Sequence, residues 1–523
     1  PKPMNRTMPI VVTAPRWKQA LAVLITAIAF ERLFWQAGLG LNLALFTLLV
    51  LSGSLVLHGA QYLTLPARIA LVLTLLADLM VVVHGTAVAI VGAVAGLLVT
   101  SALIMEPGLR SLPYALGQAV TNLFVGPFRL PSGLSAVLAV NRRASRGWRW
   151  FQLALVPVLV FVVYLQLYRV ANPRFDTFSA SFLDGFGRWL AEAFAELLTP
   201  HFLFLVLAVL VAAGLLLRNA PKAWSLPESH WTDVLLRRRS RRPGWLRPLP
   251  MNALERERRR GILLLVMVNA LLVVVNIIDI HWFWTGFEVP EGFSLKQFVH
   301  EGTWVLVFSI LLSMAILLHL FRANQNFHPK ARTMRLLALL WVAQNFVLGV
   351  SVYLRNQHYI SFHGLAYKRI GVIVFLVLVL VGLVTLFRKI RHRLSLYHLL
   401  RVNAWAAFVV LVALGFVDWD RVIVRHNLHH DNPAEIDIDN YLAMSDRVLP
   451  LLYADLELVE RQMKKHRRNT VRWVDHLDPA EFRGALDAKR MRFVEGKAGS
   501  DLRSWTWGEA RALSELQAMG LDR

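Results

Sequence analysis

The chain contains no cysteine among its 523 residues. That absence excludes disulfides, thiolate metal sites, iron–sulfur clusters and cysteine nucleophiles. Charge is also scarce, because Asp, Glu, Lys and Arg make up 17% of the residues, against about 25% in typical soluble domains. A chain that is 56% hydrophobic and so poor in charge is typical of a protein with many membrane spans.

Short catalytic signatures are missing as well. The sequence has no Walker A motif, no GxGxxG that opens a helix after a strand, and no GxSxG, which argues against nucleotide-driven and serine-hydrolase chemistry. The net charge of +23 does not indicate nucleic-acid binding, because residues 418–523 hold 17 Lys and Arg against 19 Asp and Glu. The excess lies instead in short loops between apolar runs. We predict no cofactor and allow for a bound lipid.

Apolar runs of 17 or more residues recur along the chain, and each can cross the roughly 30 Å hydrocarbon core of a bilayer. The predicted fold class is an all-α polytopic membrane protein with about 11 transmembrane helices and a small helical C-terminal extramembrane domain. The predicted domains are 1–417 in the membrane and 418–523 outside it. The eleven predicted spans lie near 19–35, 41–58, 66–84, 86–104, 151–168, 201–217, 261–279, 302–321, 334–353, 369–387 and 402–417.

Loop charges predict the orientation of these spans. If the N-terminus lies inside, five alternate inside segments are strongly basic, and they are 1–18, 105–150, 218–260, 322–335 and 388–401. The outside segments 169–201 and 281–301 carry net negative charge, and 354–369 is the one basic exception. The positive-inside rule then predicts an inner-membrane protein of a bacterium, with its N-terminus in the cytoplasm and its C-terminus in the periplasm.

Ionisable groups inside a bilayer are candidate functional residues, since burying each costs a few kcal/mol. Asp78, in "LLADLMVVVHG", is the one carboxylate that the sequence places deep in a span. A proton or cation relay is one interpretation, and a buried hydrogen bond or a salt bridge to Arg32 or Arg68 is the favoured one. The mid-span amides of Asn269, Asn276, Gln344 and Asn345 are expected to join helices.

The histidines of "RHNLHHD" are a candidate metal site. His426, His429 and His430 stand at i, i+3 and i+4, a spacing that gathers imidazoles on one side of a helix. No HExxH motif accompanies them, and Pro433 follows closely. Solvated polar side chains are therefore the favoured interpretation, and no metal is predicted.

Several stretches, in order along the chain, carry a family resemblance. They read "ERRRGILLLVMVNALLVVVNIIDIHWFW", "FVHEGTWVLVFSILLSMAILLHLFRANQNF", "WVAQNFVLGVSVYLRNQHYI", "GLAYKRIGV", "FVDWDRVIVRHNL" and "DIDNYLAMSDRVLPLL". From about residue 260 to 455 the chain resembles an uncharacterised family of bacterial multi-pass membrane proteins, a domain of unknown function common in the Bacteroidetes. "LYRVANPRFD" upstream also fits. The resemblance implies a fold and no activity, substrate or cofactor.

The sequence departs from this family at two places. It has Leu365-Ala366-Tyr367 where the family more often has Leu-Thr-Tyr, and it carries "HHDNPAE" where the family has a shorter connection. The second departure makes a shared metal role for the histidines less favoured.

The resembling blocks gather on the outer face of the predicted topology. Binding or structural candidates there are His300, Arg355, Lys368, Arg369, Trp419 and Asp420. Because the predicted loop 354–369 is basic, we expect the start of the tail to fold back onto it, with carboxylates of the tail neutralising the loop. The predicted partners of Arg355, Lys368 and Arg369 are Asp418, Asp420, Asp437 and Asp439.

Three functions remain open at this point. The favoured one is a non-catalytic membrane subunit or scaffold that binds protein partners through its outer face and tail, besides the lipid bilayer itself. The alternative is a transporter or lipid-handling protein for an anionic substrate, with Asp78 and the outer basic cluster as its binding groups. The third is a cell-envelope enzyme, which needs paired carboxylates or a metal that the sequence does not clearly supply.

Overall fold

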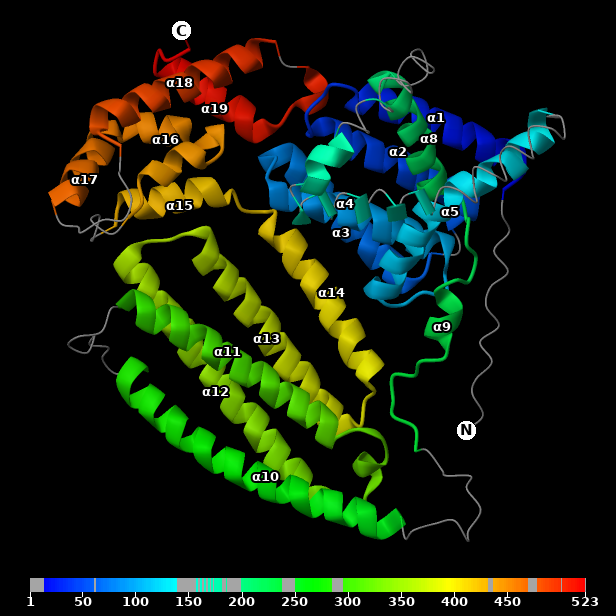
Figure 1. Cartoon of the computed structure of the whole chain (residues 1–523), viewed down its shortest axis with the longest axis vertical. Coiled ribbons are helices and arrows are strands. Elements are labelled where there is room, and N and C mark those ends of the chain that lie inside the picture. The colour runs from blue at the N-terminus through cyan, green and yellow to red at the C-terminus, as the bar shows by residue number, and fades with distance from the viewer. Residues whose placement is uncertain are drawn as a thin grey trace. The chain divides into compact units, whose positions relative to one another are not determined.

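The computed structural model is helical wherever it forms regular elements (Figure 1). Among the residues it describes, the one β-type pairing is an isolated bridge between Val234 and Leu394. An all-α fold is thereby confirmed. The described residues are 14–60, 63–138, 200–237, 250–284, 295–430, 436–468, 477–499 and 501–522, with scattered positions of 157–199.

Eight helices in these ranges are long and apolar enough to cross a membrane, which confirms a multi-pass membrane protein. Helix α1 (Arg16–Phe34) and the shorter apolar helix α8 (Pro200–Leu216) coincide with two further predicted spans. The predicted span 151–168 lies largely outside the described residues, so the count of eleven stays a prediction. The eight are Leu41–His58, Leu65–His84, Ala87–Met105, Leu254–Trp282, Gly302–Leu320, Arg332–His363, Tyr367–His392 and Leu396–Leu414.

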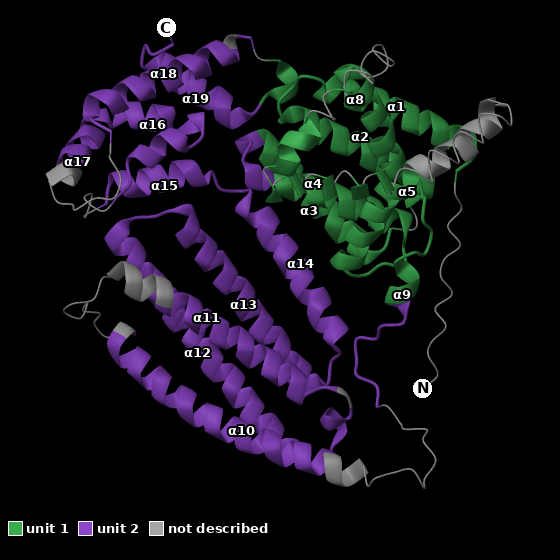
Figure 2. Cartoon of the chain, viewed as in Figure 1, with its two compact units in different colours: residues 1–82, 90–228, 501–505 green, residues 83–89, 229–500, 506–523 purple. Residues whose placement is uncertain are grey.

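The chain forms two compact units (Figure 2). Unit 1 comprises Pro1–Val82, Ile90–Glu228 and Asp501–Trp505, and unit 2 comprises Val83–Ala89, Ser229–Ser500 and Thr506–Arg523. These are units of packing, and they do not test whether residues 418–523 lie outside the membrane.

Unit 1 is built around α1, α2 (Leu41–His58), α3 (Leu65–His84), α4 (Ala87–Met105), α5 (Leu112–Leu138) and α8, with the short α9 (Ser225–Ser229) and the 3₁₀ turn η8 (Leu502–Ser504). Small residues let these helices approach closely. A Cβ at Gly96 of α4 would lie 2.5 Å from the Thr74 hydroxyl of α3, and the Thr74 and Thr100 hydroxyls are 2.9 Å apart. Close contacts of this kind drive helix association in membranes.

The membrane part of unit 2 centres on α12 (Arg332–His363). This helix packs against α10 (Pro250–Asp279), α11 (Leu295–Leu320) and α13 (Tyr367–His392), and α13 packs on α14 (Leu396–Leu414). Amides join α10 to α12, because Gln344 Nε2 donates to Asn269 Oδ1 at 2.6 Å and Asn276 Nδ2 donates to the Gln344 carbonyl at 3.1 Å. The interhelical role is confirmed for these three residues, whereas Asn345 donates to the Trp341 carbonyl of its own helix.

Helix α12 is longer than the sequence suggested. The predicted outer loop 354–369 is helical as far as His363, where Gly364 ends the helix at φ +76°. Such a left-handed backbone is accessible to glycine at little cost. Arg355 and Tyr359 therefore lie on the last turns of α12 rather than in a loop.

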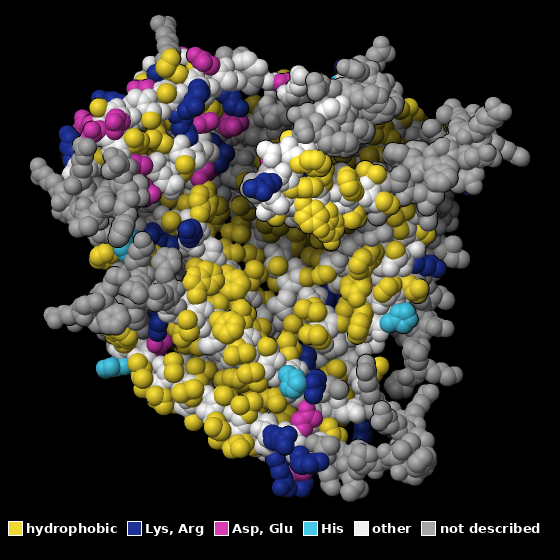
Figure 3. All heavy atoms as spheres, viewed as in Figure 1, with side chains coloured by type: hydrophobic (Ala, Val, Ile, Leu, Met, Phe, Trp, Pro, Cys, Tyr) yellow, Lys and Arg dark blue, Asp and Glu magenta, His cyan; other side chains and the backbone are white. Residues whose placement is uncertain are grey.

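The outer surface of α10 is strongly apolar. Its exposed side chains recur at helical spacing, and they are Leu263, Met267, Leu271, Val274 and Ile278. Figure 3 shows this apolar surface over α10–α13, with Lys and Arg gathered at the end of α10 that begins at Pro250. A soluble monomer rarely exposes so large an apolar patch, whereas a bilayer covers it.

The tail of unit 2 has its own apolar core. It consists of α15 (Trp419–Leu428), the 3₁₀ turns η6 (Asp439–Ala443) and η7 (Asp446–Val448), α16 (Leu449–Ala454), α17 (Leu456–Arg468), α18 (Pro479–Ala498) and α19 (Trp507–Ala518). Tyr441, Phe482 and Leu516 are almost wholly buried in this core, which also takes in Ile370 from α13. The tail therefore packs on the connection between α12 and α13.

Candidate functional site

Three helices of unit 2 surround a cavity of about 560 Å³ beside the α12–α13 connection. Its lining is mostly apolar and comes from α11, α12 and the start of α13. The lining residues are Thr303, Trp304, Asn356, Tyr359, Ala366, Lys368, Arg369, Gly371 and Val372. A volume of this size falls within the range of ligand pockets, and the cavity includes Lys368 and Arg369 of the predicted basic cluster.

Arg369 is fixed by the end of α12. Its Nη1 donates to the His363 carbonyl at 2.7 Å and also to the Gly364 carbonyl. Its guanidinium stacks over the Tyr359 ring, 4.6 Å from the centroid. A cation at a helix C-terminus satisfies otherwise orphaned carbonyls and the negative end of the helix dipole. Stacked and bonded in this way, the guanidinium is held rigidly at the cavity.

No carboxylate among the described residues forms an ion pair with Lys368 or Arg369, although the chain holds 21 such ion pairs in the same ranges. Lys368 is exposed at the rim. The hydroxyl of Thr303, a residue only 4% exposed, lies in the same lining without a hydrogen-bond partner among those residues. Two uncompensated cations and an unsatisfied hydroxyl next to an apolar wall suit an anionic group that carries an apolar chain.

Arg355 lies one turn before Tyr359 on α12 and has a different environment. Its Nη2 donates to Asp279 Oδ1 at 2.6 Å, and both side chains are nearly buried. Gly302 of α11 makes room for this pair, since a Cβ there would lie 3.3 Å from Arg355 Nη1. Asp279 ends α10 and is followed by the π-helical turn η3 (Ile280–Trp284). Arg355 is thus a structural cation, tying α12 to α10.

The ion-pair partners predicted for the basic segment 354–369 are wrong. Asp418 accepts from Arg447 Nε at 2.7 Å, and Asp420 lies 3.6 Å from Arg447 Nη2, so both carboxylates pair within the tail. Arg355 pairs with Asp279 instead. The reason is geometric: Arg355 lies on α12 and faces α10 rather than the tail.

The predicted contact between tail and turn is nevertheless confirmed. Asn427 of α15 brackets Leu365, accepting from its N–H at 2.7 Å and donating to its carbonyl at 2.9 Å. A Cβ at Gly364 would lie 2.6 Å from Asn427 Oδ1, so the contact needs glycine there. Tyr367 also donates to Asp420 Oδ1 at 2.5 Å. Hydrogen bonds of Asn427 and Tyr367 therefore join the turn to the tail in place of the predicted ion pairs.

The other predicted residues lie around this region. Trp419 donates from its indole to the Leu414 carbonyl at 3.0 Å and packs against the tail core. His300 lies on the first turns of α11, where the structure describes the backbone and not the side chain.

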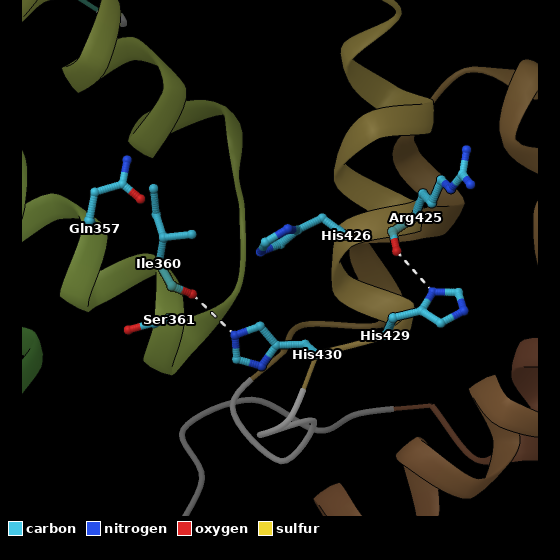
Figure 4. Close-up of a pocket in the computed structure, with 7 residues that line it drawn as sticks. All are labelled: Gln357, Ile360, Ser361, Arg425, His426, His429 and His430. Atoms are coloured by element: carbon cyan, nitrogen blue, oxygen red, sulfur yellow. Dashed lines mark hydrogen bonds between the residues drawn. The ribbon is translucent and has the colours of Figure 1, made fainter.

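The three candidate metal-binding histidines line a second cavity, of about 580 Å³, between α12 and α15. Their nitrogens do not converge, because His429 bonds to the Arg425 carbonyl and His430 to the Ile360 carbonyl, both at 3.1 Å (Figure 4). His426 is exposed, yet partial desolvation and the nearby His430 hold its pKa below the ordinary value. In the part of the chain that the structure describes, no three His, Asp or Glu side chains are placed to hold a metal.

Asp78 lies on α3 in unit 1, and neither proposed salt bridge forms. Arg32 is exposed and lies 3.5 Å from Glu31, while Arg68 donates to the Leu63 carbonyl. Both carboxyl oxygens of Asp78 are buried, without a hydrogen-bond partner among the described residues.

Sequence reasoning missed two groups of this region. Asp279 was not recognised as a buried carboxylate, although Asn269, Asn276 and Asp279 share one face of α10 and so indicate a polar seam. Thr303 gave no signal, because its importance depends on which helices surround it.

The comparisons with known proteins identify a family. A model of the family described as "Domain of unknown function (DUF4153)" matches residues 20–454, and the chain belongs to that family. The match begins far upstream of the resembling blocks and covers both Asp78 and the α11–α13 cavity. No curated protein and no solved structure matches the chain.

Proposed function

We propose that this DUF4153 protein is a lipid-handling membrane protein, which binds an anionic lipid or a similar amphiphile in the α11–α13 cavity. One observation carries the proposal: Lys368 and Arg369 meet no described carboxylate at a cavity that is otherwise mostly apolar. Multi-pass membrane location supports it without specifying the ligand. The proposal takes up the lipid-handling alternative for an anionic substrate.

The cavity offers separate sites for the two ends of such a ligand. A phosphate would lie between the Lys368 ammonium and the Arg369 guanidinium, with the Thr303 hydroxyl as a further donor. An acyl chain would lie along Trp304 and Val372. Tryptophan is common at the membrane–water boundary, where headgroups and chains meet.

Orientation forms part of the same proposal. The basic loops favour a cytoplasmic N-terminus in a bacterial inner membrane. The α12–α13 connection would then face the periplasm, and the ligand would come from the outer leaflet.

A cavity-filling substitution tests the proposal. A Cβ added at Gly371 meets nothing within 4 Å, so Gly371→Leu fills the cavity without a backbone clash. Gly484→Leu on α18 is the matched control, since Gly484 also has open space and lies outside the cavity. Native mass spectrometry of delipidated protein with added phosphatidylglycerol, and with phosphatidylcholine for comparison, measures binding.

Wild type and Gly484→Leu should retain phosphatidylglycerol in preference to phosphatidylcholine, and Gly371→Leu should lose it. Lys368→Gln should weaken the preference about fivefold, because a basic residue near an anionic surface contributes about 1 kcal/mol. Arg388→Gln, an exposed arginine toward the other end of α13, should leave it unchanged. Equal retention of both lipids by wild type, or binding by Gly371→Leu as strong as that of Gly484→Leu, would refute the proposal.

Binding of protein partners through the outer face and tail, the function favoured by the sequence, stays a prediction. So does the cell-envelope enzyme.

A further inference from the structure

Among the buried carboxylates that the structure describes in unit 1, Asp78 alone has no hydrogen-bond partner in the described residues. Glu106 binds Arg218 through both oxygens, at 2.5 and 2.9 Å. Glu228 accepts from the backbone N–H groups of Arg110 and Ser111 at 2.9 and 2.8 Å. Asp78 is as inaccessible as these, at 3% exposed, yet neither of its oxygens has a hydrogen-bond partner in the described ranges.

On α2 and α4, the two helices that cited contacts place against this part of α3, charged groups are remote from the Asp78 carboxyl. Helix α4 contains no titratable residue at all, and α2 contains only His58. His58 bonds to the Leu216 carbonyl and lies eleven residues from Thr47, about 16 Å along the helix. On α3 itself, Arg68 and His84 are ten and six residues from Asp78, or about 15 and 9 Å. Within the described helices α2, α3 and α4, no fixed cation therefore lies close enough to compensate a charge at Asp78.

The polar groups near the Asp78 carboxyl are threonine hydroxyls. Thr47 of α2 is wholly buried, and its hydroxyl is close enough to act on the Asp78 carboxyl. The two groups nevertheless make no direct hydrogen bond, and the Thr47 hydroxyl has no other partner in the described residues. Thr74 lies one turn before Asp78 on α3, but its hydroxyl already bonds to the Ala70 carbonyl and to the Thr100 hydroxyl. Hard cations prefer oxygen ligands, carboxylates among them.

We propose that Asp78 binds one exchangeable monovalent cation, a proton or a sodium ion, at the carboxyl and beside the Thr47 hydroxyl. A bare carboxylate inside a membrane bundle costs several kcal/mol, and a bound cation removes that cost without a fixed partner. The inference goes beyond the proposed lipid binding and does not depend on it, because the two sites belong to different units.

Carbodiimide labelling tests the inference on the full-length wild-type protein. Dicyclohexylcarbodiimide enters apolar regions and modifies protonated carboxyl groups, and mass spectrometry of peptides locates the adduct. Asp279 is a control within the same chain, because it is equally buried but bonded to Arg355. Labelling is followed over a pH series, with sodium chloride or choline chloride at matched ionic strength.

Asp78 should be labelled and Asp279 should not. For a proton site, labelling falls to background as the pH rises, and sodium has no effect. For a sodium site, sodium protects Asp78 and choline does not. No labelling of Asp78 at any pH without sodium, or labelling that neither pH nor sodium changes, would overturn the inference.

Thr47→Val tests the hydroxyl without touching the carboxyl. Asp78 should still be labelled in this variant. The sodium or proton concentration at which labelling is half-maximal should shift several-fold. A dependence identical to that of wild type would remove Thr47 from the site.

Discussion

Two aspartates of this chain are buried to the same extent, each 3% exposed, but in opposite surroundings. Asp279 in unit 2 accepts a 2.6 Å hydrogen bond from Arg355, whereas Asp78 in unit 1 accepts none from the described residues. A buried charge must be paired, hydrogen-bonded or neutralised. Asp279 is therefore neutralised by a fixed partner, whereas the cation proposed at Asp78 can exchange.

Removing the fixed partner should have the largest effect. Arg355→Met leaves Asp279 buried and unpaired, so the free energy of unfolding should fall by about 3–5 kcal/mol. Detergent-unfolding titrations of the purified protein measure it.

The rescue variant combines Arg355→Met with Asp279→Leu. Because a buried pair can often be replaced by apolar residues at little cost, the double variant should recover most of the lost stability. A double variant no more stable than the single one would show that the pair matters through something other than charge.

A third aspartate, Asp420, is an intermediate case between Asp279 and Asp78. Asp420, at 8% exposed, accepts from the Tyr367 hydroxyl and from the Ser445 N–H, and it lies 3.6 Å from Arg447 Nη2. Asp420→Asn should cost about 1–3 kcal/mol, because hydrogen bonds to a charged group are lost. Faster limited proteolysis of the tail reports the loss.

Asp437→Asn is the control for that substitution, since Asp437 is exposed on the same tail. It should change stability by less than about 0.5 kcal/mol. Equal protease sensitivity of the two variants would contradict the role assigned to Asp420.

The smallest predicted effect is the pH dependence of stability that His426 contributes in unit 2. The pKa of the exposed His426 is held below its ordinary value by partial desolvation and by His430, and solvent screening keeps the effect on stability small. The folded form therefore binds fewer protons than the unfolded chain, and the stability from neutral His426 is complete above the unfolded pKa of about 6.5. It declines as the pH falls from there toward the folded pKa.

His426→Gln should flatten this part of the stability profile, measured by thermal unfolding over a pH series. Any loss of stability at low pH that this variant still shows must come from other groups. The variant is therefore a suitable background for pH experiments on Asp78. A profile identical to that of wild type would contradict a lowered pKa at His426.

Composition and apolar run length were enough to predict an all-α membrane protein, because crossing a bilayer imposes a minimum length on each helix. The end of α12 was predicted wrongly, since polar residues from Arg355 to His358 suggested a loop. Gly364 was the available signal, because glycine commonly follows a helix end.

The site was only partly predictable, for a different reason. Lys368 and Arg369 stood out by charge, but the cavity beside them depends on α11 lying against α12 and α13. The pair of Asp279 and Arg355 joins residues 76 positions apart, and no local pattern states which helices become neighbours. Asp78 was recognised as a buried carboxylate, while its lack of a partner could be seen only once α2 and α4 were in place.

Infrared difference spectroscopy tests most directly whether the two buried aspartates are neutralised differently. In sodium-free buffer, the spectrum of wild type minus Asp78→Asn should show the C=O stretch of a protonated carboxyl group. The spectrum of wild type minus Asp279→Asn should show the bands of an ionised carboxylate. If removing Asp78 instead removed ionised-carboxylate bands, the exchangeable cation at Asp78 would be contradicted.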